Sequence, residues 1–353
     1  MTPDAEARVI VLGASGTLGA RIVRLLGREL PGVRVVGAGR HPETLATPEA
    51  RHLDLDDPPS FASALEGARA LIHAAGPLDH DAGPLVSACL ESGVDYLDLA
   101  EDPAFVARVQ RAAAALAAPR ARVVTGCSTV PGLVALLARR FEGRRDMASL
   151  DAHLSLGSRN PVSAGLLYGL LRPIGRPGPT GKPWFSRLVR FRFADGRERS
   201  FGRYPIALEK GVDLQGPTIP VRLFVGFDRA LLNILLAQSG RFLPRLSSDT
   251  LRRLCDRMLP VARAARLLGG EEGRLALVAR DADDHELARL ELYVEAEGLD
   301  VPASPVVWAL RRLLESRDSP PAGAAPLERL IEPGEALDWL RSHGYRVVES
   351  GVQ

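Results

Sequence analysis

Three glycines at intervals of three residues follow the first apolar run of the chain, and they constrain its fold more than any other feature. The run is Val9–Leu12, and the residues after it read Gly13-Ala14-Ser15-Gly16-Thr17-Leu18-Gly19 before a helical pattern begins. Glycine permits a tight turn, a close approach of the backbone to a ligand, and close packing of a helix on a strand. We therefore expect the chain to begin with a strand, a sharp turn and a helix.

Short β-rich runs alternate with helical patterns from Arg8 to about Pro131, which is typical of βαβ units around a parallel sheet. The apolar character of the runs is continuous, as expected of strands covered on both faces. This pattern predicts a doubly wound, Rossmann-type α/β domain over residues 1–145. We expect its strands at Val9–Leu12, Val33–Gly37, Leu71–Ala74, Tyr96–Leu99 and Val123–Thr125, and its helices at Leu18–Leu30, Phe61–Glu66, Gly83–Ser92 and Pro103–Ala117.

The pattern changes after Pro131, where the β-rich runs become amphipathic. One predicted hairpin turns at Asp195-Gly196, and another joins Leu275–Arg280 to Leu287–Glu295. In the latter strand Leu290, Leu292 and Val294 share one face, and Arg289, Glu291 and Glu295 share the other, polar face. We therefore expect residues 146–300 to form an α+β substrate or dimerisation domain on a half-exposed antiparallel sheet. Residues 301–353 are expected to pack back on the first domain, with a helix near Glu335–His343 and a strand near Tyr345–Glu349.

Composition excludes several classes of protein. The 353 residues include 45 basic and 43 acidic side chains, a net charge of +2, so we expect no nucleic-acid partner. The cysteines Cys89, Cys127 and Cys255 are far apart and lack zinc-ligand spacing, which predicts free thiols and no metal site. No apolar run is long enough to span a bilayer, and the first eight residues do not resemble a signal peptide. These features predict a cytoplasmic protein.

The glycine turn predicts a dinucleotide site. The first N–H groups of a helix have no intrahelical partner, so a diphosphate there gains hydrogen bonds and the helix dipole. We assign Gly13, Ser15, Gly16, Thr17, Leu18 and Gly19 to this site. The second strand ends without a carboxylate for the ribose diol of NAD, and Arg40 follows it, which favours the 2′-phosphate of NADP. NAD remains possible. Asp54 is expected beside the adenine or as a turn cap.

Residues that follow the other strands are candidates for the reacting end of the site, because ligands lie outside the carboxyl ends of parallel strands. His80 is a candidate general acid or a surface residue. Glu101 is a candidate for orienting an amine or for capping a helix, and Cys127 is a candidate nucleophile or a buried small residue. None of the five tyrosines has a lysine four residues later, so the short-chain dehydrogenase mechanism is excluded.

Four segments together resemble the saccharopine dehydrogenase-like oxidoreductases. They are Val9 to Gly19, Leu71 to Pro77, Ala88 to Ala100, and Cys127 to Leu133. The resemblance implies a two-domain enzyme with a nicotinamide cofactor. It also places Gly76 and Pro77, preceded by Ala75, against that cofactor.

The resemblance further implies hydride transfer to or from an imine or carbonyl of a small metabolite, with the substrate in a cleft between the domains. Reduction of an enoyl thioester is an alternative, since related members are thought to catalyse it. A second alternative is a scaffold or redox sensor that binds a nucleotide without catalysis. A homodimer is a further possibility. No arginine-rich dicarboxylate motif aligns, so saccharopine itself is not the expected substrate.

Overall fold

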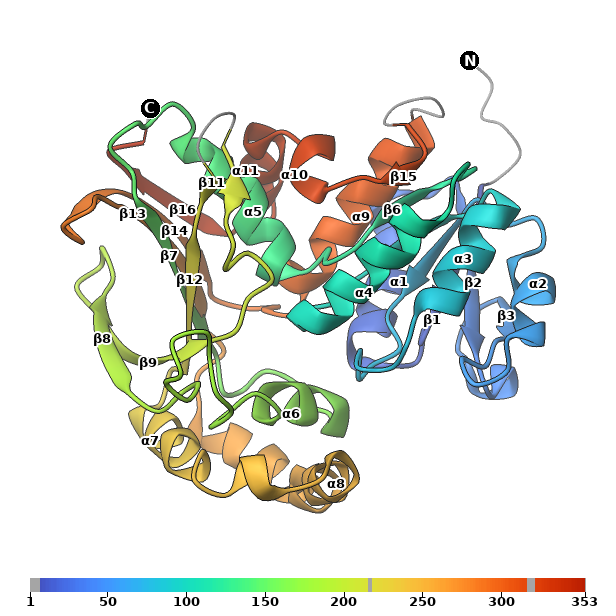
Figure 1. Cartoon of the computed structure of the whole chain (residues 1–353). Helices are drawn as coiled ribbons and strands as arrows, with labels where there is room; N and C mark the ends of the chain where they lie inside the picture. Colours follow the sequence, from blue (N-terminus) through green and yellow to red (C-terminus); the bar gives the residue numbers. More distant parts are fainter. Residues whose placement is uncertain (1–6, 215–217, 316–320, 353) are drawn as a thin grey trace. The chain divides into compact units, whose positions relative to one another are not determined.

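The computed structural model describes residues 7–214, 218–315 and 321–352. The chain forms two compact units, and each is made from two separate segments (Figure 1). Unit 1 consists of residues 1–136 and 299–332, and unit 2 consists of residues 137–298 and 333–353.

Unit 1 is built on a seven-stranded parallel sheet with the order β15-β6-β5-β4-β1-β2-β3. Its strands are β1 (Ala7–Leu12), β2 (Val33–Gly39), β3 (Glu49–His52), β4 (Ala70–His73), β5 (Asp95–Asp98), β6 (Arg122–Val124) and β15 (Gly323–Ala324). Its main helices are α1 (Thr17–Glu29), α2 (Pro59–Leu65), α3 (Gly83–Ser92), α4 (Pro103–Ala115), α9 (Asp300–Glu315) and α10 (Leu327–Leu330). The predicted Rossmann-type sheet is confirmed.

Strand β1 marks the point where the strand order reverses. It pairs in parallel with β2 on one side and with β4 on the other. Residues Val9 to Leu12 are at most 2% exposed, as the continuous apolar run predicted. Ligands of open α/β sheets bind at such a switch point, beyond the carboxyl ends of the strands. The fold therefore places the glycine turn at that edge.

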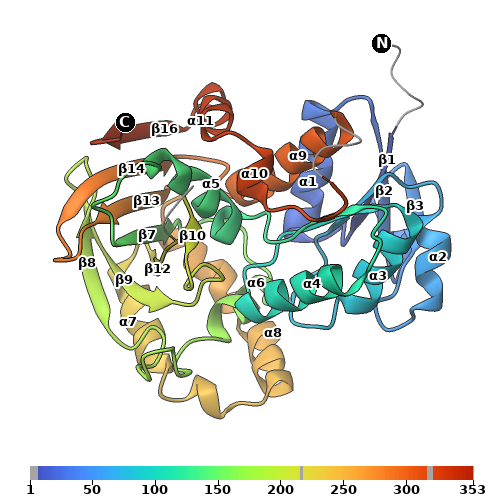
Figure 2. The ribbon, with the colours of Figure 1, turned by 45° about the horizontal axis from the view of Figure 1, so that its top comes forward.

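Helix α9 packs on α1 although about 280 residues separate them in the sequence (Figure 2). Asp300 lies in the first turn of α9 and accepts hydrogen bonds from Arg21 at 2.7 Å and Arg24 at 2.8 Å. A carboxylate in this position also interacts favourably with the helix dipole. This contact anchors a distant segment of the chain on the helix that follows the glycine turn.

Unit 2 contains a seven-stranded sheet with the order β16-β14-β13-β7-β12-β9-β8. Its strands are β7 (Ser149–Leu156), β8 (Leu188–Arg192), β9 (Glu198–Tyr204), β12 (Val221–Phe227), β13 (Gly273–Arg280), β14 (Glu286–Val294) and β16 (Arg346–Ser350). Both predicted hairpins form, β8 with β9 and β13 with β14. The expectation of an antiparallel sheet needs correction, because β7 and β12 pair in parallel and make the sheet mixed.

The predicted polar face of β14 is exposed only in part, because Arg289 is half-buried and Glu295 is exposed just after the strand ends. Glu291 is fully buried, and its two carboxylate oxygens accept the Ala194 N–H at 3.1 and 3.0 Å from the end of the β8 segment. Glu291 also accepts hydrogen bonds from Arg289 at 2.8 Å and from the Tyr293 hydroxyl. The β8–β9 hairpin thus folds back over the sheet and encloses a core that includes Phe191, Phe193, Phe201, Ala276, Val278 and Tyr293.

The C-terminal segment, expected to pack on the first domain, is divided between the units. Strand β16 pairs with β14 and extends the sheet of unit 2, because β14 would otherwise be an edge strand with unpaired backbone groups. The remaining main helices are α5 (Val134–Ala138), which spans the boundary, and α6 (Ala164–Leu171), α7 (Ala230–Ser239), α8 (Ser248–Ala265) and α11 (Pro333–Ser342) in unit 2. In the part of the chain that the structure describes, no helix is both long and apolar enough to cross a membrane.

Candidate functional site

The glycine turn is packed so tightly that side chains are excluded from it. Gly13 has a φ of +84°, and a Cβ built on it would lie 2.7 Å from the Ala75 Cα. A Cβ on Gly19 would lie 2.0 Å from the Gly13 carbonyl oxygen. The Gly13 N–H donates to the Ala38 carbonyl at 3.0 Å, and the Gly16 N–H donates to the Gly13 carbonyl at 2.9 Å. The turn therefore joins the ends of β1, β2 and β4 through backbone contacts.

The N-terminus of α1 is open to an anion. Gly16 is the N-cap residue, and no side chain of the described residues caps the first turn. Ser15 and Gly16 are exposed, and Thr17 and Leu18 are partly exposed. Uncapped N–H groups can donate hydrogen bonds to the oxygens of a diphosphate, and the positive end of the helix dipole attracts its negative charge. These residues fit the diphosphate of a dinucleotide.

The segment after β4 lies beside this turn. The Ala74 N–H donates to the Leu12 carbonyl at 2.9 Å, which holds the two strand ends together. The Ala75 backbone packs directly against Gly13 and leaves no space for a side chain there. Gly76 is exposed and has open space where a side chain would be. The structure thus brings Ala75, Gly76 and Pro77 to the same sheet edge as the glycine turn.

Arg40 and Asp54 follow the neighbouring strands β2 and β3. Arg40 is exposed, and its carbonyl oxygen lies 3.2 Å from His52 Nδ1. Asp54 Oδ1 accepts the N–H of Asp56 at 3.1 Å, which is an Asx turn. The capping alternative for Asp54 is therefore the one that the hydrogen bonds support, while the Arg40 guanidinium is accessible from solvent.

His80 lies near a second histidine, His73, which is not among the site residues predicted from the sequence. His73 ends β4, and the ring centroids of His73 and His80 are 5.0 Å apart. His73 Nδ1 lies 2.9 Å from the Tyr96 hydroxyl. Desolvation lowers the pKa of His73 to about 3 and also lowers the pKa of His80, so both imidazoles are neutral at pH 7. The rule that strand-end residues face the ligand would have identified His73.

The Nε2 atoms of both histidines are buried and have no hydrogen-bond partner among the described residues. His80 Nδ1 lies 3.3 Å from the Pro77 carbonyl oxygen, which ties the imidazole to the turn after β4. A neutral imidazole is a weak source of a proton, so the structure gives little support to His80 as a general acid.

Asp98 organises the ends of β5 and β6. Its buried carboxylate accepts the N–H groups of Ala100 at 2.9 Å and Gly126 at 2.8 Å, and the Thr125 hydroxyl at 2.8 Å. Desolvation raises the pKa of Asp98, and these hydrogen bonds oppose the rise. These three hydrogen bonds fix the loops after β5 and β6. Because its oxygens are already bound to these donors, the Asp98 carboxylate is not free for proton transfer.

Glu101 lies in the loop that Asp98 shapes, just after β5. Its Oε1 accepts the Ser128 hydroxyl at 3.0 Å, which links it to the loop after β6. Its side chain keeps exposure to solvent, yet desolvation of the carboxyl raises its pKa to about 6, while the bond from Ser128 acts in the opposite direction. Glu101 can therefore hold a proton in mildly acidic solution. Asp102, the next residue, is the one that caps α4.

Cys127 does not meet the requirements of a nucleophile. Its side chain is fully buried, and its Sγ donates to the Val124 carbonyl at 3.4 Å. Burial raises the pKa of the Cys127 thiol well above its usual value, and the Asp98 carboxylate adds to this effect. Since the thiolate is the reactive form, the alternative of a small buried residue is the one that the structure supports.

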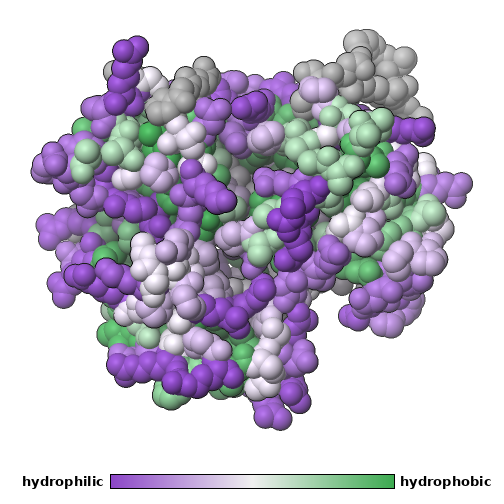
Figure 3. All heavy atoms as spheres, in the orientation of Figure 1, coloured by the Kyte–Doolittle hydropathy of each residue, from purple (hydrophilic) through white to green (hydrophobic). Residues whose placement is uncertain are grey.

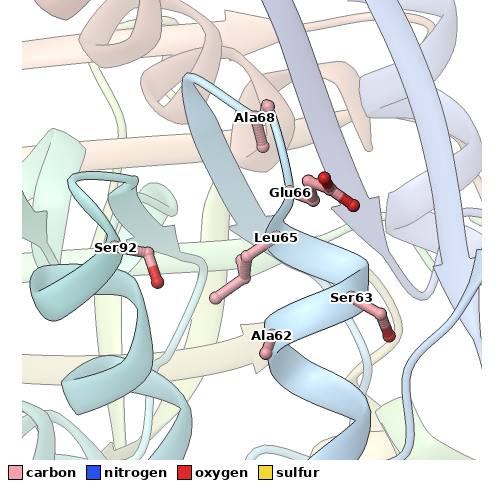
Figure 4. Close-up of a pocket in the computed structure, with 7 residues that line it drawn as sticks. Ala62, Ser63, Leu65, Glu66, Ala68 and Ser92 are labelled. Carbon is pink, nitrogen blue, oxygen red and sulfur yellow. The ribbon is translucent and has the colours of Figure 1, made fainter.

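A surface pocket of unit 1 lies away from this edge (Figure 4). Its lining comes from the end of α2, the loop that leads into β4, and the end of α3, and comprises Ala62, Ser63, Leu65, Glu66, Gly67, Ala68 and Ser92. Both helices end just before the amino ends of the next strands. The pocket is therefore at the edge of the sheet opposite to the glycine turn, and we assign no role to it.

The amino-acid sequence of this chain is similar to that of known proteins. Residues 9–124 match the family model described as the saccharopine dehydrogenase NADP binding domain. A protein of Arabidopsis thaliana named "Probable mitochondrial saccharopine dehydrogenase-like oxidoreductase" is 26% identical over 186 residues. That match covers 46% of this chain and 41% of the relative, so the chain matches less than half the length of that protein. The expected cytoplasmic location stays a prediction.

A solved structure shares the fold across both units. Apo saccharopine dehydrogenase (L-Glu forming) from Saccharomyces cerevisiae is 14% identical, with a TM-score of 0.63 and coverage of 98% of this chain and 99% of that chain. At this identity the likeness shows the fold alone. The resemblance predicted from the sequence is confirmed: residues 9–124 match the saccharopine dehydrogenase NADP binding domain, and the chain is similar to a protein named as a saccharopine dehydrogenase-like oxidoreductase.

Proposed function

We propose that this protein is an NADP-dependent oxidoreductase that transfers hydride to or from an imine or carbonyl carbon of a small metabolite. The observation that carries the proposal is the uncapped N-terminus of α1 at the switch point of the sheet. Gly13 and Ala75 pack so closely there that no side chain fits at position 13. The match to an NADP binding domain over residues 9–124 supports the same conclusion.

In this proposal the residues of the turn bind the diphosphate through the N–H groups of Thr17 and Leu18. Arg40 pairs with the 2′-phosphate, since a guanidinium forms charge-assisted hydrogen bonds with phosphate oxygens. The exposure of Arg40 beside the end of β2 supports this role. Gly76 and Pro77 form one wall of the nicotinamide site. When bound, the nicotinamide supplies the hydride or accepts it.

Glu101 is the proposed proton donor in the direction of reduction. Hydride addition to a C=N or C=O carbon leaves a negative charge on nitrogen or oxygen, and a proton from the carboxyl neutralises it. The Ser128 hydroxyl orients the carboxyl, and the raised pKa lets it carry a proton near pH 6. His80 and Cys127 are not given a chemical role, because one is neutral and the other is a buried thiol.

Titration of NADPH and NADH into the full chain, followed by nicotinamide fluorescence, tests the first half of the proposal. We expect NADPH to bind at sub-millimolar concentration and more tightly than NADH. Absence of binding by both nucleotides would contradict the proposal. The second half is tested by NADPH consumption with imines formed from keto acids and amines, with ketones and with enoyl thioesters. If the protein turned over enoyl thioesters and none of the imines or ketones, the substrate class would be enoyl thioesters and the proposed one would be wrong.

A further inference from the structure

Exposed large hydrophobic side chains are confined to one stretch of unit 2 among the described residues. They are Leu231 at 66%, Ile234 at 46% and Leu235 at 56% exposure in α7, Phe242 at 67% after it, Met258 at 43% and Val261 at 64% in α8, and Leu267 at 82%. Single exposed apolar residues are common and need no explanation. All seven lie between residues 231 and 267, on α7, on α8 and in the segments that follow these helices, and together they are here named the α7–α8 surface.

Three apolar residues of helix α7 face outward, whereas Leu232 and Leu236 are half-buried. Leu231, Ile234 and Leu235 have the i, i+3, i+4 spacing of one helix face. Asn233 is fully buried on the other side, where its side-chain oxygen accepts the Phe227 N–H at 2.7 Å and its side-chain nitrogen donates to the Ser200 carbonyl at 2.9 Å. These hydrogen bonds fix the orientation of the helix, so the outward position of the leucines is built into the fold.

The same stretch is strongly basic. Residues 229–268 contain eight arginines and two aspartates, with no lysine or glutamate, although the whole chain has a net charge of only +2. Seven of these arginines are exposed, namely Arg229, Arg241, Arg245, Arg252, Arg253, Arg257 and Arg263. In Figure 3, hydrophobic residues reach the surface over α7 and are bordered by hydrophilic ones.

We propose that the α7–α8 surface binds the anionic headgroup face of a lipid bilayer. Leucine, isoleucine and phenylalanine side chains enter the boundary between headgroups and acyl chains, and arginines around them pair with phosphate and carboxylate groups of anionic lipids. Helix α7 has ten residues, which is about 15 Å of helix. The hydrocarbon core of a bilayer is roughly 30 Å thick, which is twice the length of α7. The helix is therefore too short to cross the bilayer, and in this proposal it lies along the membrane surface.

Charge complementarity favours this occupant over the alternatives. A second copy of the chain in a two-fold contact would place the same basic surface against itself, and like charges would repel. A nucleic acid would match the arginines but not the outward leucines, which offer no stacking faces for bases. A bilayer with anionic lipids matches both properties.

Flotation of the full chain with lipid vesicles tests the proposal. We expect the protein to float with vesicles of phosphatidylcholine and phosphatidylserine, to float weakly with phosphatidylcholine alone, and to lose part of its binding at high salt. The double changes Leu231→Ser with Leu235→Ser and Arg253→Glu with Arg257→Glu should each reduce the partition constant by roughly tenfold or more. Circular dichroism and the thermal midpoint report whether each variant is folded.

The matched control changes two arginines elsewhere in unit 2. Arg190 and Arg192 lie on β8 with side chains 83% and 73% exposed, so Arg190→Glu with Arg192→Glu alters the net charge equally. We expect this control to retain at least half of the binding. Failure of the unmodified chain to float with phosphatidylserine vesicles would overturn the proposal, as would an equal loss in the control. A dimer in light scattering that Leu231→Ser with Leu235→Ser converts to a monomer, without vesicle binding, would assign the surface to a second copy.

Discussion

Gly13 and Ala75 approach so closely that a Cβ on Gly13 would lie 2.7 Å from both the Cα and the N atom of Ala75. Gly13 also has a φ of +84°, which residues with a side chain adopt at a cost. We expect Gly13→Ala to destabilise the protein by more than about 1 kcal/mol and to separate the ends of β1 and β4. Denaturant unfolding measures the first effect, and NADPH titration measures the accompanying loss of cofactor affinity.

Gly27 provides the control for this change. It lies within α1, and a Cβ built on it meets nothing within 4 Å. Alanine is the better helix former by roughly 0.5–1 kcal/mol, so Gly27→Ala should stabilise the protein slightly and leave cofactor affinity unchanged. If Gly13→Ala and Gly27→Ala changed stability and NADPH affinity equally, the close packing of Gly13 would have no role in the cofactor site.

Arg40 is expected to determine the preference for NADP. A guanidinium bound to a phosphate contributes roughly 1.5–3 kcal/mol, which corresponds to about a 10- to 150-fold difference in affinity. Arg40→Asp should therefore weaken NADPH by this factor and leave NADH unchanged or improved. Arg120→Asp is the matched control, because Arg120 is exposed just before β6, at the opposite edge of the same sheet. Equal losses for both nucleotides would place Arg40 outside the 2′-phosphate site.

Glu101 should control the pH dependence of reduction. Its carboxyl must be protonated to donate, and its pKa is raised to about 6, so kcat should decrease about tenfold per pH unit above pH 6. Ser128→Ala removes a hydrogen bond that lowers this pKa, so the midpoint of the profile should move to higher pH. Glu101→Gln should reduce kcat by roughly 100-fold or more, whereas Glu91→Gln at the exposed end of α3 should not. An unchanged midpoint in Ser128→Ala would exclude the proposed role.

Local patterns in the sequence were sufficient to predict the glycine turn and five of the seven strands of the first sheet, but not the short strands β3 and β15. The apolar run Val9–Leu12 and the glycines after it determine a strand, a turn and a helix through contacts near in sequence. The hairpin at Asp195-Gly196 was predictable for the same reason, since its turn residues and alternating pattern are local. Such features need no information about distant parts of the chain.

Features that depend on distant contacts were not predictable. Glu291 alternates with leucines, a pattern typical of a solvated face, but the Ala194 N–H, almost 100 residues earlier, covers it. Strand β16 pairs with β14 because an edge was available there. The position of His73 at a strand end could have been predicted, but its contact with the Tyr96 hydroxyl could not, because Tyr96 comes from the next strand. In each case the partner is supplied by the fold.

The Glu291 carboxylate should be among the most important single groups for the stability of unit 2. Glu291→Ala would remove one of the acceptors of the Arg289 guanidinium and would leave the Ala194 N–H without its acceptor, at an expected loss of about 1–3 kcal/mol. Glu286 also pairs with Arg289, at 2.6 Å, but its side chain is 36% exposed. Glu286→Ala should therefore cost about 0–1 kcal/mol. Urea unfolding measures both, and similar losses would contradict the role of Glu291 as a buried acceptor.

His153 should make the protein sensitive to acid. Its imidazole is stacked between Phe191 at 4.0 Å and Phe224 at 4.8 Å, and its Nδ1 is buried without a partner among the described residues. Desolvation, with nearby arginines, lowers its pKa to about 3, while an unfolded histidine titrates near 6.5. Between these values only the unfolded chain binds the proton, so stability falls as pH decreases from about 6.5 toward 3.

Phenylalanine in place of His153 should remove this dependence. Each pH unit within the window contributes up to about 1.4 kcal/mol, so His153→Phe should lose less stability than the unmodified protein between pH 6.5 and 4. At pH 8, where the imidazole is neutral in both states, the two proteins should differ by less than about 1.5 kcal/mol, because the ring keeps its stacked partners. Urea unfolding at a series of pH values measures the difference. His41→Gln at the surface, where the side chain is 72% exposed, should retain the acid dependence. Parallel stability curves for His153→Phe and the unmodified chain would mean that the imidazole is protonated in the folded state or reaches solvent.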